Sequence, residues 1–156
     1  MPKILKYAVI GLALTFLIAQ FIRPSFTNPP VNASERLEAS VNVPVDVAAI
    51  LKRSCSDCHT NETDYPWYSQ ITPVNWWLKN HIDEGRDEMN FSTWGTYTPK
   101  RKAKKLEEVC EQVESGAMPL PSYLWAHRDA VLSPDDAKLL CSWSKSVRES
   151  LNGGTQ

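Results

Sequence analysis

The chain has 156 residues, of which 42% are hydrophobic and 22% are charged. This length suits a single domain with a tail, and this composition excludes wholesale disorder. Lys and Arg total 17 and Asp and Glu total 18, so the net charge of -1 argues against a general polyanion binder and predicts no nucleic-acid partner. The charge is uneven, because the first 28 residues hold Lys3, Lys6 and Arg23 and no acidic residue.

The N-terminal segment from Ile4 to Ile22 is apolar apart from three polar residues. As a helix it would span roughly 28 Å, close to the hydrocarbon thickness of a bilayer. Because Lys3 and Lys6 stand at its start, we expect the N-terminus to stay in the cytoplasm and the rest to be exported. Residues 1–23 therefore predict a single-pass transmembrane anchor in the inner membrane. The alternatives are a cleaved signal peptide, although no small-x-small cleavage site follows Ile22, and a buried core helix.

Residues 24–44 form the next segment, in which four prolines alternate with Asn and Ser. This composition predicts a semi-extended linker that lifts a domain off the membrane.

Residues 45–152 predict an all-α domain of about four helices. Apolar residues recur at helical spacing over residues 45–55, 74–89, 99–115 and 133–152. The last of these helices has a clear start, with Ser133 as the cap, Pro134 at the first helical position and two acidic residues at the positive end of the dipole. We expect no strand, and we expect residues 153–156 to form a flexible tail.

The strongest chemical signal is the C-x-x-C-H motif formed by Cys55, Cys58 and His59. Two thiols at this spacing can reach the two vinyl groups of one haem, and the adjacent histidine then lies beneath the iron as the proximal ligand. The motif predicts one covalently attached haem c. A thioredoxin-like pair would need a βαβ context, and a zinc site would need a further ligand such as Cys110, Cys141 or His81.

The ligand on the other side of the iron is predicted to be Met118, which lies in a loop braced by Pro119 and Pro121. His81 is the alternative distal ligand, because it lies on the apolar face of its predicted helix. His127 and an open or water-bound iron are further alternatives, and Met118 would otherwise serve only in packing.

The aromatic residues are more numerous than a core of this size requires, and a haem offers them a large apolar surface. The candidate pocket residues are Trp67, Trp77, Trp94 and Tyr123. Ordinary core packing remains the alternative for part of this set.

Cys110 and Cys141 lie on the apolar faces of the third and fourth predicted helices. In a small domain these helices should pack together, and an exported domain meets an oxidising compartment. We therefore expect a disulfide between them. The alternative is that both are small buried apolar residues.

Residues 55–127, with CSDCHTNETDYPWYSQITPVNWWLKNHIDEGR, FSTWGTYTPK and MPLPSYLWAH, resemble the bacterial membrane-anchored haem-binding domain family that carries CxxCH. The resemblance implies a membrane-tethered, cytochrome c-like domain that faces the periplasm. Cys55, Cys58 and His59 match the attachment motif of the family, and Met118 matches the position at which cytochrome c-like domains place their axial methionine.

The expected function is one-electron transfer in the periplasm, with a redox partner protein that the sequence does not name. Two alternatives stay open: a haem-based sensor or small-ligand binder with a labile sixth ligand, and a peroxidase-type enzyme. The last is disfavoured because the sequence offers no distal acid–base set.

Overall fold

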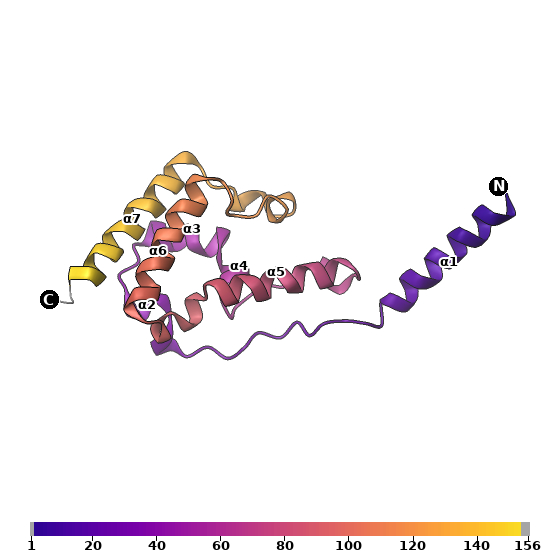
Figure 1. Ribbon diagram of the computed structural model, residues 1–156, viewed down its shortest axis with the longest axis horizontal. Helices are drawn as coiled ribbons and strands as arrows, with labels where there is room; N and C mark the ends of the chain where they lie inside the picture. Colours follow the sequence, from indigo (N-terminus) through magenta and orange to yellow (C-terminus); the bar gives the residue numbers. More distant parts are fainter. Residues whose placement is uncertain (1, 154–156) are drawn as a thin grey trace.

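A computed structural model describes residues 2–153, and these residues form helices and loops without a strand. The α-helices are α1 (Lys3–Ala19), α2 (Leu37–Ser40), α3 (Val45–Ser54), α4 (Ser56–His59), α5 (Val74–Glu88), α6 (Pro99–Glu114) and α7 (Pro134–Gly153). Five short 3-10 helices join them: η1 (Ala33–Glu35), η2 (Trp67–Gln70), η3 (Phe91–Thr96), η4 (Tyr123–Trp125) and η5 (Arg128–Ala130). The predicted all-α class is confirmed (Figure 1).

The four long helices of the domain, α3, α5, α6 and α7, lie close to the ranges predicted from apolar spacing. The start of α7 is the predicted one. The Ser133 hydroxyl accepts a hydrogen bond from the Asp136 backbone amide at 3.1 Å, and the Asp136 carboxylate accepts one from the Ser133 amide at 2.8 Å. This reciprocal arrangement is a capping box. Of the tail expected at residues 153–156, Gly153 ends α7 and residues 154–156 lie outside the described residues.

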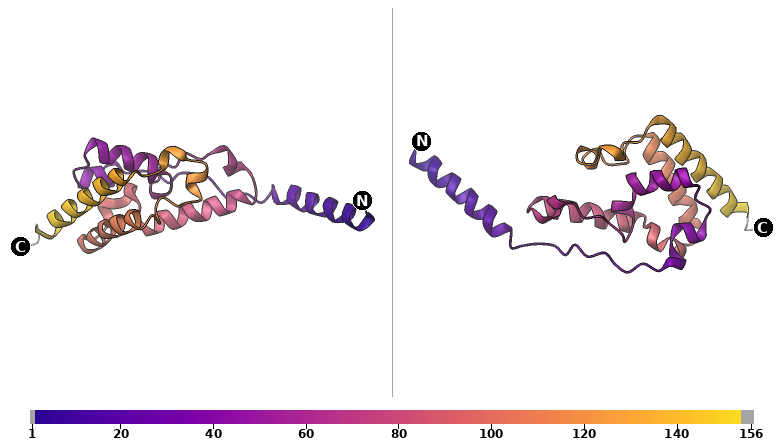
Figure 2. Two further views of the ribbon diagram at one scale, coloured as in Figure 1. Left: turned by 90° about the horizontal axis from the view of Figure 1, so that it is seen from above. Right: turned by 180° about the vertical axis from the view of Figure 1, so that it is seen from behind.

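Helix α1 stands apart from the domain at the N-terminal end of the chain and buries none of its side chains (Figures 1 and 2). It is shorter than the predicted anchor and ends at Ala19; the side chain of the next residue, Gln20, pairs with the backbone of Thr72 through hydrogen bonds of 2.9 and 3.0 Å. Across the described part of the chain, no helix has the length and apolar character needed to span a membrane. The predicted transmembrane helix is therefore not supported.

The first part of the predicted linker is extended, its second part forms η1 and α2, and both parts are bound to the domain. The side chain of Asn28 exchanges two hydrogen bonds with the backbone of Thr63, at 3.0 and 3.2 Å. Further along, Leu37 is 1% exposed and belongs to the hydrophobic core. The second half of the predicted linker thus contributes to the domain itself, because its apolar side chains complete the core.

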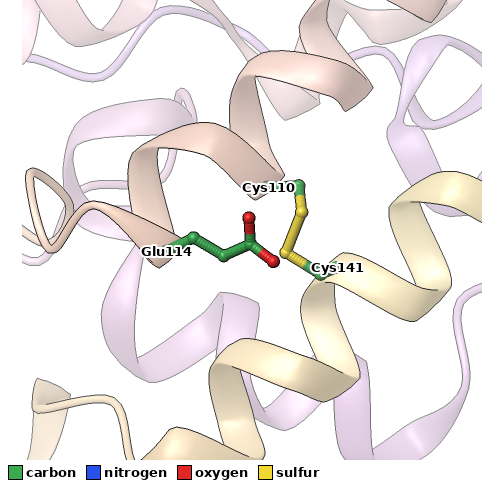
Figure 3. A group of neighbouring side chains, drawn as sticks. All are labelled: Cys110, Glu114 and Cys141. Carbon is green, nitrogen blue, oxygen red and sulfur yellow. A yellow bond between two sulfur atoms is a disulfide. The ribbon is translucent and has the colours of Figure 1, made fainter.

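The core forms where α6 and α7 pack along each other and against α3. The disulfide between Cys110 and Cys141 joins α6 to α7, with 4.6 Å between the two Cα atoms, which confirms the predicted pair (Figure 3). The Glu114 side chain lies beside this disulfide. Because both sulfurs are spent in the disulfide, neither supplies the thiolate that a zinc site shared with Cys55 and Cys58 would need.

Candidate functional site

The C-x-x-C-H motif lies where α3 ends and the short helix α4 begins. Cys55 caps α3 through a hydrogen bond from its amide to the Leu51 carbonyl at 3.0 Å, and the Ser56 hydroxyl donates to the same carbonyl at 3.1 Å. The His59 amide then donates to the Cys55 carbonyl at 3.0 Å, closing one helical turn. Residues three and four apart share one side of a helix, so this turn presents Cys55, Cys58 and His59 together.

Both cysteines of the motif are free and partly buried. Burial raises the pKa of the Cys55 thiol to about 12 and that of the Cys58 thiol to about 11. The two groups are therefore neutral thiols at physiological pH. This state does not suit a thiolate redox pair, which needs a lowered pKa, and it does suit the addition of an S–H bond across a vinyl group.

The His59 ring is oriented by one hydrogen bond. Its Nδ1 atom lies 2.9 Å from the backbone carbonyl oxygen of Met89. Because a carbonyl oxygen only accepts, Nδ1 carries the proton and Nε2 keeps its lone pair. Burial lowers the pKa of His59, which favours the neutral ring. A neutral imidazole whose other nitrogen donates to a carbonyl is the usual form of a metal-ligating histidine.

A buried polar network holds the Met89 carbonyl in place from the next residue, Asn90. The Asn90 side chain donates to Asn61 at 2.8 Å and accepts from the Ser92 amide at 2.9 Å. Its backbone amide donates to the Tyr97 hydroxyl at 2.9 Å. Because each of these bonds restrains Asn90, the preceding carbonyl has little freedom to turn away from His59.

Helix α5 packs directly against the motif because of a glycine. A Cβ atom at Gly85 would lie 2.8 Å from the carbonyl oxygen of Cys58, closer than real contacts allow. The next residue, Arg86, donates to the Thr60 carbonyl and to the Thr63 hydroxyl, both at 2.8 Å. Sequence reasoning missed both roles; the one visible signal was a glycine inside a helical pattern.

Two cavities border the motif. The first, of about 440 Å³, contains Cys55, His59 and Met118 in its wall, with the apolar side chains of Leu51, Met89, Phe91, Val109, Val113 and Leu140 around them. The second, of about 580 Å³, is bordered by Cys58 and is lined chiefly by apolar and aromatic groups, among them Val74, Trp77, Leu78, Leu120, Tyr123 and Trp125. Both volumes lie in the range of cofactor pockets.

Met118 reaches the first cavity through the turn that follows α6. Gly116 adopts a φ of 71°, the left-handed conformation that commonly ends a helix. The chain then folds back, and the Met118 amide donates to the Gln112 carbonyl at 3.1 Å. The structure thus brings Met118 into the same cavity as His59, although the two residues are far apart in the sequence.

His81 lies in the second cavity, beside Cys58. Its ring is 4.4 Å from that of Trp77, and its buried Nδ1 atom has no hydrogen-bond partner among the described residues. Since an unpaired buried nitrogen is costly, this atom is a candidate for a ligand bond.

His127 is engaged by two tyrosines. Its Nε2 atom lies 2.9 Å from the Tyr68 hydroxyl, and its ring stacks on Tyr123 with 4.1 Å between the centroids. The Tyr123 hydroxyl in turn donates to Asp57, inside the motif, at 2.7 Å. These contacts hold the loop of η4 against the motif. They also engage the Nε2 atom and one ring face of His127, which disfavours it as an iron ligand.

The four candidate pocket aromatics separate into three environments. Trp77 and Tyr123 border the second cavity. Trp94 is 1% exposed and belongs to the hydrophobic core, so neither of the two cavities includes it. Trp67 is 76% exposed and also lies outside both cavity walls. The number of aromatic residues in the sequence does not predict which of them line a cavity, because an aromatic ring can also lie in the core or at the surface.

Lys105 lies at the edge of the first cavity, where α6 passes the motif. Its ammonium group contacts the Glu88 carboxylate at 2.9 Å and the Glu108 carboxylate at 2.7 Å. Burial by itself would lower the pKa of Lys105, but the two carboxylates outweigh it and raise that pKa. The positive charge of Lys105 is therefore balanced by glutamates of the protein itself.

An all-helical domain in which a C-x-x-C-H motif with two free thiols and an oriented neutral histidine lies between two cavities has the features of a haem-binding protein. A family model described as a haem-binding domain matches residues 14–146, and the chain belongs to this family. The search of curated proteins and the search of solved structures found no match. The residues present fit a haem, because His59 Nε2 keeps its lone pair, both thiols are unbridged, and the first cavity combines apolar side chains with charged ones such as Lys105.

Proposed function

We propose that this protein is a c-type haem protein that transfers one electron at a time. In this proposal Cys55 and Cys58 form thioethers with one haem, and His59 binds its iron through Nε2. The observation that carries the proposal is the hydrogen bond of 2.9 Å from His59 Nδ1 to the Met89 carbonyl, one turn away from two free thiols. When bound, the haem supplies the redox chemistry, and the protein supplies ligands, burial and orientation.

Met118 is the proposed ligand on the opposite side of the iron. It shares the first cavity with His59, and the turn after α6 holds its backbone. A thioether in this position raises the reduction potential and leaves no open coordination site, which suits electron transfer. His81 is the second candidate, supported by its unpartnered Nδ1 atom and its place in the second cavity, which Cys58 also borders.

Optical spectra of the purified protein test this function. Electron transfer predicts a low-spin spectrum in the reduced state that carbon monoxide leaves unchanged. Rapid carbon monoxide binding would instead support a sensor, a small-ligand binder or a peroxidase-type enzyme, each of which needs a labile or open sixth position. Haem staining after denaturing electrophoresis tests the covalent attachment separately.

We also propose that the domain is held at the inner membrane and faces the periplasm. The apolar side chains of α1 are exposed, and Lys3 and Lys6 precede or open the apolar stretch. The disulfide between Cys110 and Cys141 fits an oxidising compartment. Fractionation tests the proposal: the protein should stay with membranes after a carbonate wash, and recovery in the soluble fraction would contradict it.

A further inference from the structure

The domain exposes a group of large apolar side chains near the start of α5, which we call the aromatic face: Trp67, Val74, Trp76, Trp77 and Trp125. Their exposed fractions run from 39% for Val74 to 77% for Trp125. Single exposed apolar residues are ordinary, but a contiguous group of this size marks an interaction surface. We propose that the aromatic face rests on the surface of a lipid bilayer.

The members of the face come from different segments, and three of them border one cavity. Val74, Trp77 and Trp125 all border the second cavity. The Trp67 ring lies 5.8 Å from that of Tyr68, which borders the same cavity. The face therefore draws on η2, the start of α5 and η4, which all contribute residues to the wall of this cavity.

The chain leads from α1 directly onto this face. The Trp76 indole donates to the Ile22 carbonyl at 2.8 Å, and Gln20 exchanges two hydrogen bonds with the Thr72 backbone. In Figures 1 and 2 the start of α5 and the loop of η4 both extend towards the side on which α1 lies. The end of α1 and the aromatic face thus lie at the same end of the domain.

A bilayer is the occupant that these features favour. Tryptophan is enriched at the membrane–water interface, because its ring is apolar and its N–H needs a polar partner. The adjoining α1 exposes apolar side chains along its length, so α1 and the aromatic face both suit contact with lipid. This inference rests on the proposed membrane tethering and adds that the domain itself, and not only α1, touches lipid.

Lipid photolabelling tests the inference on the full-length, haem-loaded protein. Vesicles of phosphatidylcholine and phosphatidylglycerol would contain a phosphatidylcholine with a diazirine in its acyl chain, and mass spectrometry would locate the label. We expect label on α1 and on residues 65–77 and 121–127, with α7 at background. In the double variant Trp67→Ser/Trp125→Ser, label on those two segments should fall while label on α1 stays unchanged.

Val45→Ser is the matched control, since Val45 is 87% exposed but lies on α3, outside the aromatic face. It should keep the wild-type labelling pattern. Label confined to α1 would overturn the aromatic face as a lipid contact and leave the tether standing. Absence of label from α1 as well would overturn both proposals, and loss of labelling in Val45→Ser would show that the effect is not specific to the face.

Discussion

His59 and Met89 lie 30 residues apart in the sequence and are joined by a hydrogen bond of 2.9 Å from the ring Nδ1 atom to the backbone carbonyl oxygen. This bond sets the tautomer, so Nε2 is the nitrogen that keeps its lone pair. It also connects the motif on α4 to the polar network around Asn90. His59 and the elements that orient it therefore form one unit.

The two cysteines of the motif should be required for covalent haem. Cys55→Ala/Cys58→Ala should show no haem stain after denaturing electrophoresis, because each thioether needs its own thiol. Each single variant should lose one attachment and show an altered pyridine haemochrome spectrum. The matched control is Cys110→Ala/Cys141→Ala, which should keep its stain. Full staining of the first double variant would contradict covalent attachment through this motif.

Met118 should control the iron spectrum and potential. Met118→Ala should remove the sulfur-to-iron charge-transfer band and lower the reduction potential, because it replaces a thioether ligand with a weaker or exchangeable one. His81→Ala should leave both properties close to wild type. The reverse result, in which only His81→Ala alters the spectrum, would assign a His/His pair.

Gly85→Ala should destabilise the domain at the site. The added Cβ would lie 2.8 Å from the Cys58 carbonyl oxygen, so α4 and α5 would have to move apart. Overpacking of this kind costs about 1–3 kcal/mol. Denaturant unfolding measures the loss, and Gly11→Ala in α1 is the control, since no neighbouring atom lies within 4 Å of the position that its Cβ would take. Equal stability of both variants with wild type would contradict the close packing.

Asn90→Ala should weaken the support of His59. The substitution removes two side-chain hydrogen bonds and leaves the Asn61 Oδ1 atom and the Ser92 amide unpaired, which costs about 1–3 kcal/mol. The reduction potential should shift as well, because the Met89 carbonyl loses its restraint. Asn80→Ala is the control: Asn80 is exposed and its side chain bonds to Glu84 on the same helix, so the free energy of unfolding should change by about 0.5 kcal/mol at most. A potential unchanged in Asn90→Ala would show that the network does not orient the ligand.

The disulfide between Cys110 and Cys141 should be measurable by thiol counting. The denatured, unreduced, haem-loaded protein should react with no thiol reagent, and reduction should release two thiols. Cys110→Ser/Cys141→Ser should lower the free energy of unfolding by roughly 3 kcal/mol, because the bond closes a long loop in the unfolded chain. Two reactive thiols before reduction would mean that the bond is absent.

Local signals in the sequence were sufficient for the helices and the disulfide pair, while haem attachment through Cys55 and Cys58 stays a prediction. Helices α3, α5, α6 and α7 follow from apolar residues at helical spacing, and the start of α7 follows from the Ser133 cap, since both signals act within one turn. The pairing of Cys110 with Cys141 followed from two apolar helix faces that a small domain must bring together.

Tertiary structure decided how the site is supported. Met89 acts through its backbone carbonyl, so its side-chain type gives no sign of this role. Gly85 matters because Cys58, on another helix, packs against it. The sequence also could not tell that Trp94 is buried while Trp67 is exposed, or that Leu37 in the predicted linker completes the core. Periodicity and spacing report what lies within a few turns of the chain, whereas burial and hydrogen-bond partners depend on which distant segments fold together.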